Sequence, residues 1–424
     1  MRRNVSFEWT VVLAIALFAL GVYMHVPYGG GRVYSDIVTV FQLRECLTTC
    51  RLPVPYIQAF IEYPVVTAMF MYAMGVLGSL LPGGLLQGYY FFSYIGLLAI
   101  TLLLVRELRM ISVLRGVGGN RLLWFFVVTP TFVIALLVNW YVIGTFFTVA
   151  GIRLFLQGKK KLSGVLLGLS AASNLVTVAP ALGLLLSEGK KRSGAAFVLG
   201  GVATWGAINL PFLLLNPTQW FAAWQWSYNW YVEGSWMLLL IDIFSPVRHY
   251  LSVATFTLLL IGILLVRFKL RERDPVKLAF LATSGFLFST YVFTPQMFVL
   301  LLPFLVVLPV PGNYAEFIVF DALNAFVVLA FSGTWQLIGI NHNFISFDPR
   351  SPVQLAAAVR SLWVGKIAVY DGIFKTWNKK KTERPSLETG RLRTVKAPEE
   401  PYVPVSSLSL EDPASEPPMD SPTT

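Results

Sequence analysis

Long apolar stretches separated by short basic or aromatic connectors dominate this chain. Many approach the roughly 20 residues that an α-helix needs to cross the hydrocarbon core of a membrane. We interpret the first, from Trp9 to Val26, as a retained span, because it is long for a signal peptide and no small-residue cleavage site follows. Further apolar elements are predicted over 65–81, 86–105, 122–138, 142–157, 162–187, 195–215, 249–266, 278–293, 297–310, 316–334 and 353–374.

Lysine and arginine gather in a few connectors, and their placement sets the predicted orientation. Short basic connectors favour the cytoplasmic side of a membrane. If 65–81 crossed completely, the arginines after 86–105 would lie outside, so we predict a short re-entrant or interfacial helix ended by Pro82-Gly83-Gly84. The arginines that require this are Arg106, Arg109, Arg115 and Arg121.

The segment 162–187 lies between two basic clusters, Lys159-Lys160-Lys161 and Lys190-Lys191-Arg192, so both of its ends are predicted to be cytoplasmic. It is too short for two crossings of about 20 residues each. We therefore predict a hairpin of two short halves that turns near Asn174 to Pro180. Broken backbone at membrane depth is tolerated beside protein or a water-filled cavity, which predicts an internal cavity.

Composition agrees with this pattern. The 424 residues are 56% hydrophobic and 13% charged, which excludes an ordinary soluble globule. The net charge of +11 resides in connectors and does not indicate nucleic-acid binding. We predict an all-α, polytopic transmembrane bundle over 1–374, with roughly ten spans plus re-entrant or juxtamembrane helices, and a disordered tail over 375–424. It would lie in the plasma membrane or an endomembrane, with its N-terminus and tail cytoplasmic.

The predicted exterior loop 28–64 contains two acids among aromatic residues and prolines. Asp36 follows Tyr34-Ser35, and it is either a solvated loop acid or helix cap, or a general base acting on a sugar hydroxyl. Glu62 precedes Tyr63-Pro64 and suits the N-terminus of the next helix. The alternative is a carboxylate that orients an acceptor or a divalent metal, and both interpretations stay open.

The predicted exterior loop 216–247 is rich in tryptophan, which fits either interface anchoring or stacking on sugar rings. Interface anchoring does not explain Glu233. Cys46 and Cys50 stand four residues apart, as free thiols or as a disulfide. The chain contains no P-loop, Rossmann fingerprint, zinc-type cysteine pair or histidine-rich cluster. Exterior cations that are candidates for a lipid phosphate are Arg32, Arg44, Arg51 and Arg248.

An ordered set of motifs across most of 1–374 resembles the GT-C superfamily of integral-membrane glycosyltransferases. It is most similar to the polyprenol-phosphate-mannose-dependent mannosyltransferases, of the GPI mannosyltransferase I type, and to the related alpha-1,2-mannosyltransferase-like membrane family. Asp36 occupies the place of their proposed catalytic base. The supporting segments are Glu62-Tyr63-Pro64, Glu233-Gly234-Ser235-Trp236 and Phe293-Thr294-Pro295-Gln296.

The resemblance implies a hexosyltransferase that moves a sugar, mannose by analogy, from a polyprenyl-phosphate donor to an exterior glycan, glycolipid or protein acceptor. Membrane lipids would surround it. No cofactor is implied with certainty, and a divalent metal at Glu62 is an open alternative. The implied substrate-binding residues are Tyr34, Glu62, Tyr63, Asn139, Trp140, Glu233, Trp236 and Gln296.

Two departures from the family pattern keep other functions open. Tyr141 follows Asn139-Trp140 where the family often has aspartate, and Ser173-Asn174-Leu175 stands where a lysine before Tyr-Pro is usual. That lysine is expected to hold the donor phosphate. The alternatives are a catalytically inactive relative that binds a lipid-linked glycan or scaffolds a partner, and a membrane transporter.

Overall fold

A computed structural model describes residues 6–26, 33–41, 52–308, 314–331, 351–376 and 378. The chain divides into one unit of Met1–Lys381 and a second of Thr382–Thr424, and every described residue belongs to the first. Helices are the regular elements of these residues, and β-type pairing in them is limited to the isolated bridges Pro55–Ala59 and Glu233–Val292. The predicted all-α class is therefore confirmed for the described part, whereas the tail prediction beyond Asn378 lies outside it.

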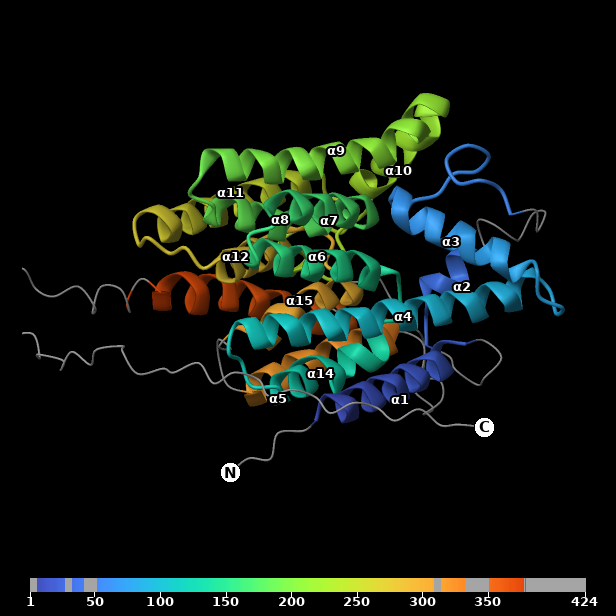
Figure 1. The fold of residues 1–424 in the computed structure, drawn as a ribbon, viewed down its shortest axis with the longest axis horizontal. Helices are drawn as coiled ribbons and strands as arrows, with labels where there is room; N and C mark the ends of the chain where they lie inside the picture. Colours follow the sequence, from blue (N-terminus) through green and yellow to red (C-terminus); the bar gives the residue numbers. More distant parts are fainter. Residues whose placement is uncertain are drawn as a thin grey trace, which may run out of the picture. The chain divides into compact units, whose positions relative to one another are not determined.

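The helices follow the apolar stretches, and most of them begin or end within a few residues of the predicted bounds (Figure 1). They are α1 (Phe7–His25), α2 (Asp36–Val40), α3 (Val65–Gly78), α4 (Leu85–Leu114), α5 (Asn120–Leu122), α6 (Tyr141–Leu156), α7 (Lys160–Ser173), α8 (Val178–Ser187), α9 (Lys191–Leu215), α10 (Pro217–Asn229), α11 (Val247–Phe268), α12 (Pro275–Ser289), α13 (Leu302–Val307), α14 (Tyr314–Phe331) and α15 (Pro352–Lys366).

Three predicted boundaries need correction. The element predicted over 86–105 continues as α4 to Leu114, so Arg106 and Arg109 lie on the helix and not in a connector. The element predicted over 122–138 is two π-helical turns, Leu123–Val127 and Thr131–Ala135, separated around Pro130, which has no backbone N–H to donate. The aromatic loop 216–247 contains the helix α10, which starts with a proline after the side-chain cap of Asn216.

The predicted break within 162–187 is confirmed. Asn174 leaves the helical conformation at φ −161° and ψ 122°, which ends α7. Its side-chain oxygen accepts a hydrogen bond of 3.1 Å from the Val176 amide and so caps the short 3-10 turn Leu175–Thr177 that leads into α8. Asn174 therefore terminates one short helix and starts the next.

Three helices in the described part of the chain, α1, α9 and α11, are long and apolar enough to cross a membrane. In α9 only 11% of the most apolar window is buried in the protein. Side chains such as Leu199 and Leu214 stay largely exposed, and an apolar surface of this extent requires a nonpolar environment. These helices indicate a membrane protein, whereas the number of spans and the orientation of the termini stay predictions.

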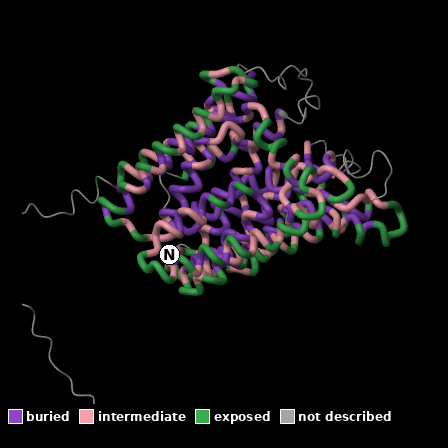
Figure 2. Tube along the Cα trace, turned by 90° about the horizontal axis from the view of Figure 1, so that it is seen from above, coloured by how far each residue is buried: buried purple, intermediate pink, exposed green. Residues whose placement is uncertain are grey.

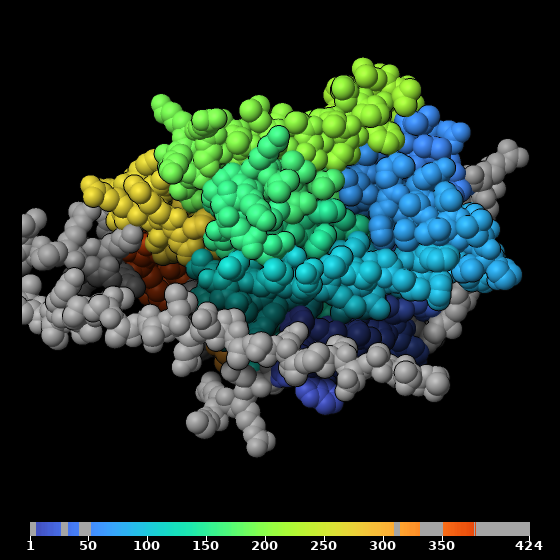
Figure 3. All heavy atoms as spheres, viewed as in Figure 1, coloured from blue at the N-terminus to red at the C-terminus, as the bar shows by residue number. Residues whose placement is uncertain are grey.

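Four helices, α9, α7, α6 and α4, pack in succession, and Figures 1 and 3 show this face of the molecule. Glycines set the approach of α7 to α9, because a Cβ at Gly168 would lie 2.5 Å from the Gly201 oxygen and one at Gly200 would lie 2.5 Å from the Lys161 oxygen. Small residues at such contacts let two membrane helices approach closely. Behind this stack, the buried residues concentrate in the middle of the described unit (Figure 2).

We expect Gly168→Ala to destabilise the protein by about 1–3 kcal/mol, because the added methyl group overlaps the backbone of α9. The matched control is Gly206→Ala, since a Cβ there meets no atom within 4 Å. The difference in stability is measured by thermal unfolding of both variants in detergent, with size-exclusion chromatography as the readout of the folded protein that remains. Equal melting temperatures would contradict the close approach.

Candidate functional site

The carboxylate of Asp36 is the centre of the candidate site. The residue begins α2 and is only 9% exposed. Its backbone is fixed to the segment before α6, because its amide donates to the Val138 oxygen at 2.7 Å and the Ser35 hydroxyl donates to the Leu137 oxygen at 2.7 Å. The first loop thus presents this acid from a defined backbone position.

Three side chains donate hydrogen bonds to this carboxylate. The Tyr34 hydroxyl lies 2.5 Å from Oδ1, the Tyr63 hydroxyl lies 2.7 Å from Oδ2, and the Asn139 amide nitrogen lies 3.0 Å from Oδ2. Burial raises the pKa of Asp36 above its ordinary value, whereas these three donors oppose the rise and the nearby Glu62 adds to it. A carboxyl group with a raised pKa that is still held by donors is suited to exchange a proton.

A cavity of about 600 Å³ lies against Asp36. Its wall comes from distant parts of the chain, including the first loop, the break after α7, the aromatic helix α10 and the turn after α12. The prediction of an internal cavity at the broken segment is confirmed, since Ser173 and Asn174 line it. The predicted site residues that line it are Tyr34, Asp36, Glu62, Tyr63, Asn139, Trp140, Glu233 and Gln296.

Acids give this wall its charge. Asp36, Glu62 and Glu233 line the cavity, and none of the described lining residues is Lys, Arg or His. Burial raises the pKa of Glu233, and the charge of Asp36 raises it further, while a hydrogen bond of 2.7 Å from the Trp230 indole opposes this rise. The described part of the cavity is therefore an acceptor-rich surface that suits hydroxyl groups.

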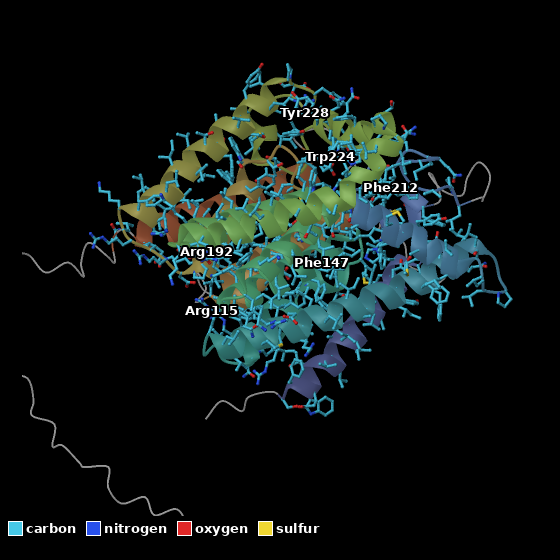
Figure 4. All side chains as sticks on the ribbon, turned by 45° about the horizontal axis from the view of Figure 1, so that its top comes forward. Arg115, Phe147, Arg192, Phe212, Trp224 and Tyr228 are labelled. Atoms are coloured by element: carbon cyan, nitrogen blue, oxygen red, sulfur yellow. The ribbon has the colours of Figure 1, made fainter. Side chains whose placement is uncertain are left out.

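Part of the wall is aromatic. Trp220, Trp224, Trp226 and Trp230 all line the cavity. Figure 4 shows Arg115 and Arg192 toward the left of its view and Trp224 and Tyr228 to their right. Flat aromatic faces beside hydrogen-bonding groups form a surface on which a sugar ring can stack.

Three buried polar atoms of the lining residues have no hydrogen-bond partner in the described structure. They are the indole nitrogens of Trp140 and Trp224 and the hydroxyl of Thr294. Trp140 is 1% exposed, and its ring packs edge-on against Tyr63 with the centroids 4.8 Å apart. Leaving a buried donor unsatisfied costs about 1–3 kcal/mol, which a ligand oxygen would offset.

Two predicted residues lie away from the cavity wall. Trp236 donates from its indole nitrogen to the Phe288 oxygen at 2.8 Å and stacks on the Phe288 ring. Arg248 donates to the carbonyls of Phe244 and Ser245, in the first turn of α11. The predictions that fall outside the described residues are those for Arg32, Arg44, Arg51, Cys46 and Cys50.

The predicted metal at Glu62 has no cluster of ligands among the described residues. No group of three or more His, Cys, Asp or Glu side chains in the described ranges is arranged to hold a metal ion. The described residues around Glu62 therefore offer no metal centre of this kind.

Sequence reasoning missed Arg360, which is fully buried near the wall and contacts the segments that carry Glu233 and Gln296. A signal for it was present. Arg360 is a charged residue inside the apolar stretch 353–374, and an ionisable side chain in such a stretch is a functional candidate by default.

No family model and no curated protein matches the chain. Among solved structures, the apo crystal structure of the Archaeoglobus fulgidus oligosaccharyltransferase is similar, with a TM-score of 0.40 and 11% sequence identity. The match covers 88% of this chain but only 56% of that one, so this chain spans a little over half of that protein's length.

Removing one donor should raise the pKa of Asp36 further, because the donors favour the ionised carboxylate. In Tyr63→Phe we expect the protonated Asp36 carboxyl to persist to higher pH than in the parent protein. Infrared titration in nanodiscs measures this, with Asp36→Asn to assign the band and Tyr72→Phe, on α3, as control. An unchanged or lower pKa in Tyr63→Phe would contradict the hydrogen bond.

Proposed function

We propose that this protein is a membrane glycosyltransferase that moves a hexose, mannose by family resemblance, from a polyprenyl-phosphate donor to an acceptor hydroxyl on the exterior side. Asp36 is the proposed general base. The observation that carries the proposal is its buried carboxylate, which lines a cavity and accepts hydrogen bonds from Tyr34, Tyr63 and Asn139.

The proposed reaction is a single displacement. The acceptor oxygen attacks the anomeric carbon while its proton passes to the ionised carboxylate of Asp36. The bond from the anomeric carbon to the phosphate oxygen breaks, and polyprenyl phosphate leaves with the bonding electrons. Attack opposite the leaving group inverts the anomeric configuration. Asp36 then releases the proton to water, which restores the base.

The size and lining of the cavity support a sugar substrate. A volume of about 600 Å³ lies in the range of small-molecule sites, roughly 300–1,000 Å³. Unpartnered donors at Trp140 and Thr294 and acceptors at Glu62 and Glu233 match the donors and acceptors of sugar hydroxyls. A hexose can stack on the tryptophans of α10 and hydrogen-bond to the polar groups of the cavity.

The donor phosphate needs a cation that the described wall lacks. In this proposal Arg32, Arg44 and Arg51 of the first loop are the candidates, since they belong to the same loop as Asp36. A guanidinium group suits phosphate because it donates two parallel hydrogen bonds.

A second function, binding of a lipid-linked glycan without turnover, is favoured by one observation. Tyr141 and Asn174 both line the cavity, at the positions where the resembling enzymes have an aspartate and a lysine. Neither residue carries charge at neutral pH, so the site has lost two ionic groups that a transferase of that family would use. Purified protein that binds polyprenyl-phosphate-mannose stoichiometrically but yields no mannosylated product would establish this function.

We expect Asp36→Asn to lower the rate of hexose transfer by about 10²–10⁴-fold, the usual contribution of a positioned general base. Radiolabelled polyprenyl-phosphate-mannose, supplied to the full chain in liposomes with a glycolipid extract as acceptor, measures the rate. Asp242→Asn is the matched control, because that acid is exposed and lies outside the cavity lining. Undiminished transfer by Asp36→Asn would remove Asp36 from the mechanism.

A further inference from the structure

Arg360 lies within α15, in a sequence that is otherwise mostly apolar, and is 0% exposed. Removing an arginine from water costs several kcal/mol, even after the protein relaxes around it. Such a residue persists only where good hydrogen bonds or a nearby charge offset that cost. Its contacts therefore indicate what it is for.

The guanidinium group holds two separate loops. One terminal nitrogen donates to the Gly234 oxygen at 3.1 Å and also to the Phe293 oxygen. The other donates to the Asn324 side-chain oxygen at 2.6 Å, and the group lies 4.1 Å from the centre of the Phe293 ring. Arg360 thus connects α15 to α14 and to both loops at once.

These two loops carry cavity residues. Gly234 follows Glu233, and Phe293 precedes Thr294-Pro295-Gln296. The loops also pair directly, since the Glu233 amide donates to the Tyr291 oxygen at 3.0 Å and the Phe293 amide donates to the Glu233 oxygen at 2.8 Å. Gly234 has a φ of +61°, and a Cβ there would lie 3.2 Å from the Arg360 nitrogen, so the backbone at this point is tightly fixed.

A second layer supports Arg360 from behind. The Asn324 amide nitrogen donates to the Pro295 oxygen at 3.1 Å and to the Thr131 hydroxyl at 2.9 Å. Gln354, also on α15, lies 3.4 Å from the Gly234 amide and accepts its hydrogen bond. The orientation of the guanidinium is therefore determined by neighbours on three sides.

We propose that Arg360 is a positioning residue of the cavity, which holds the backbone on both sides of the Glu233 bridge through Gly234 and Phe293 and favours the ionised form of Glu233 without touching substrate. This role deepens the proposed function and rests on it. It assigns Glu233 as an acceptor for ligand hydroxyl groups and Arg360 as the cation that favours its charged form at a half-buried position.

Electrostatics support this assignment. Burial raises the pKa of Glu233, the Trp230 indole and the Arg360 charge lower it, and the Asp36 charge raises it. The other titratable groups that interact with Glu233 are the tyrosines Tyr34, Tyr141 and Tyr231, all neutral at physiological pH. Arg360 is thus the one cation among the described groups that interact electrostatically with Glu233, and its removal should raise the pKa of Glu233.

The test is an infrared titration of the full-length protein in nanodiscs, which needs no turnover. The Glu233 carboxyl band is assigned by its loss in Glu233→Gln. In Arg360→Gln we expect the protonated band to persist to higher pH than in the parent protein, because losing a positive charge disfavours the ionised carboxylate. Arg360→Lys keeps the charge and should shift the band less.

Lys366→Gln is the matched control, because Lys366 is a cation of the same helix that pairs with Glu316 at 2.6 Å and is not among the groups acting on Glu233. We expect no shift of the Glu233 band in that variant. If Arg360→Gln folds but Glu233 titrates as in the parent protein, Arg360 is only structural and the proposal is overturned.

If Arg360→Gln fails to fold, the variant Asn324→Leu tests the positioning role of Arg360 instead. It leaves the cation in place but removes the acceptor that aims it, so the Glu233 band should shift in the same direction by a smaller amount. An unchanged band in a folded Asn324→Leu protein overturns the proposal.

Failure of the positioning role of Arg360 can be distinguished from failure of the proposed transferase function. A protein that shows no hexose transfer can still show the infrared shift, which would sustain the positioning role and remove the transferase assignment. Where transfer is detected, Arg360→Gln should move the acid limb of the kcat profile to higher pH, and a uniform loss of kcat at all pH values would contradict the role.

Discussion

The site depends on one constraint, which is that a buried carboxylate must be surrounded by donors. The donors to Asp36 come from its own loop, from the segment before α3 and from the segment before α6. Each of these segments must keep its position for the charge to remain tolerable inside the protein. The first loop, α3 and the irregular turns around Thr131 are therefore parts of one arrangement, although the chain reaches them separately.

A second carboxylate, Glu233, lines the same cavity and is stabilised by different groups. Glu233 receives one indole hydrogen bond and the field of Arg360, whereas Asp36 receives three neutral donors. The two acids thus face one cavity from unlike surroundings. Environments that differ in this way let two carboxyl groups of one site respond to different neighbouring groups.

Much of the fold could be predicted from the positions of apolar stretches, because a helix that crosses or lies against a membrane needs a long, continuous one. The break at Asn174 was predictable from the basic clusters on both sides of it. The length of α4 was not, since Arg106 and Arg109 lie on that helix and long basic side chains can extend from an apolar helix toward water.

The site was predictable only in part. Local sequence and resemblance both indicated the motif residues Asp36, Tyr63, Asn139 and Gln296, and all four line the cavity. Trp236 was predicted there and packs on Phe288 instead, since local sequence does not determine which neighbour an aromatic ring faces. The role of Arg360 was not predicted, because its partners Gly234 and Phe293 are 126 and 67 residues away in the chain.

The long apolar helix α9 contributes to the wall of the cavity and is also long enough to cross a membrane. Its 25 residues span about 38 Å, more than the roughly 30 Å of an average hydrocarbon layer, so lipid thickness acts on its tilt. Asn209 of this helix accepts a hydrogen bond of 3.0 Å from the Trp220 indole, and both residues line the cavity. A change in the tilt of α9 would therefore reach the aromatic wall of the cavity through this hydrogen bond.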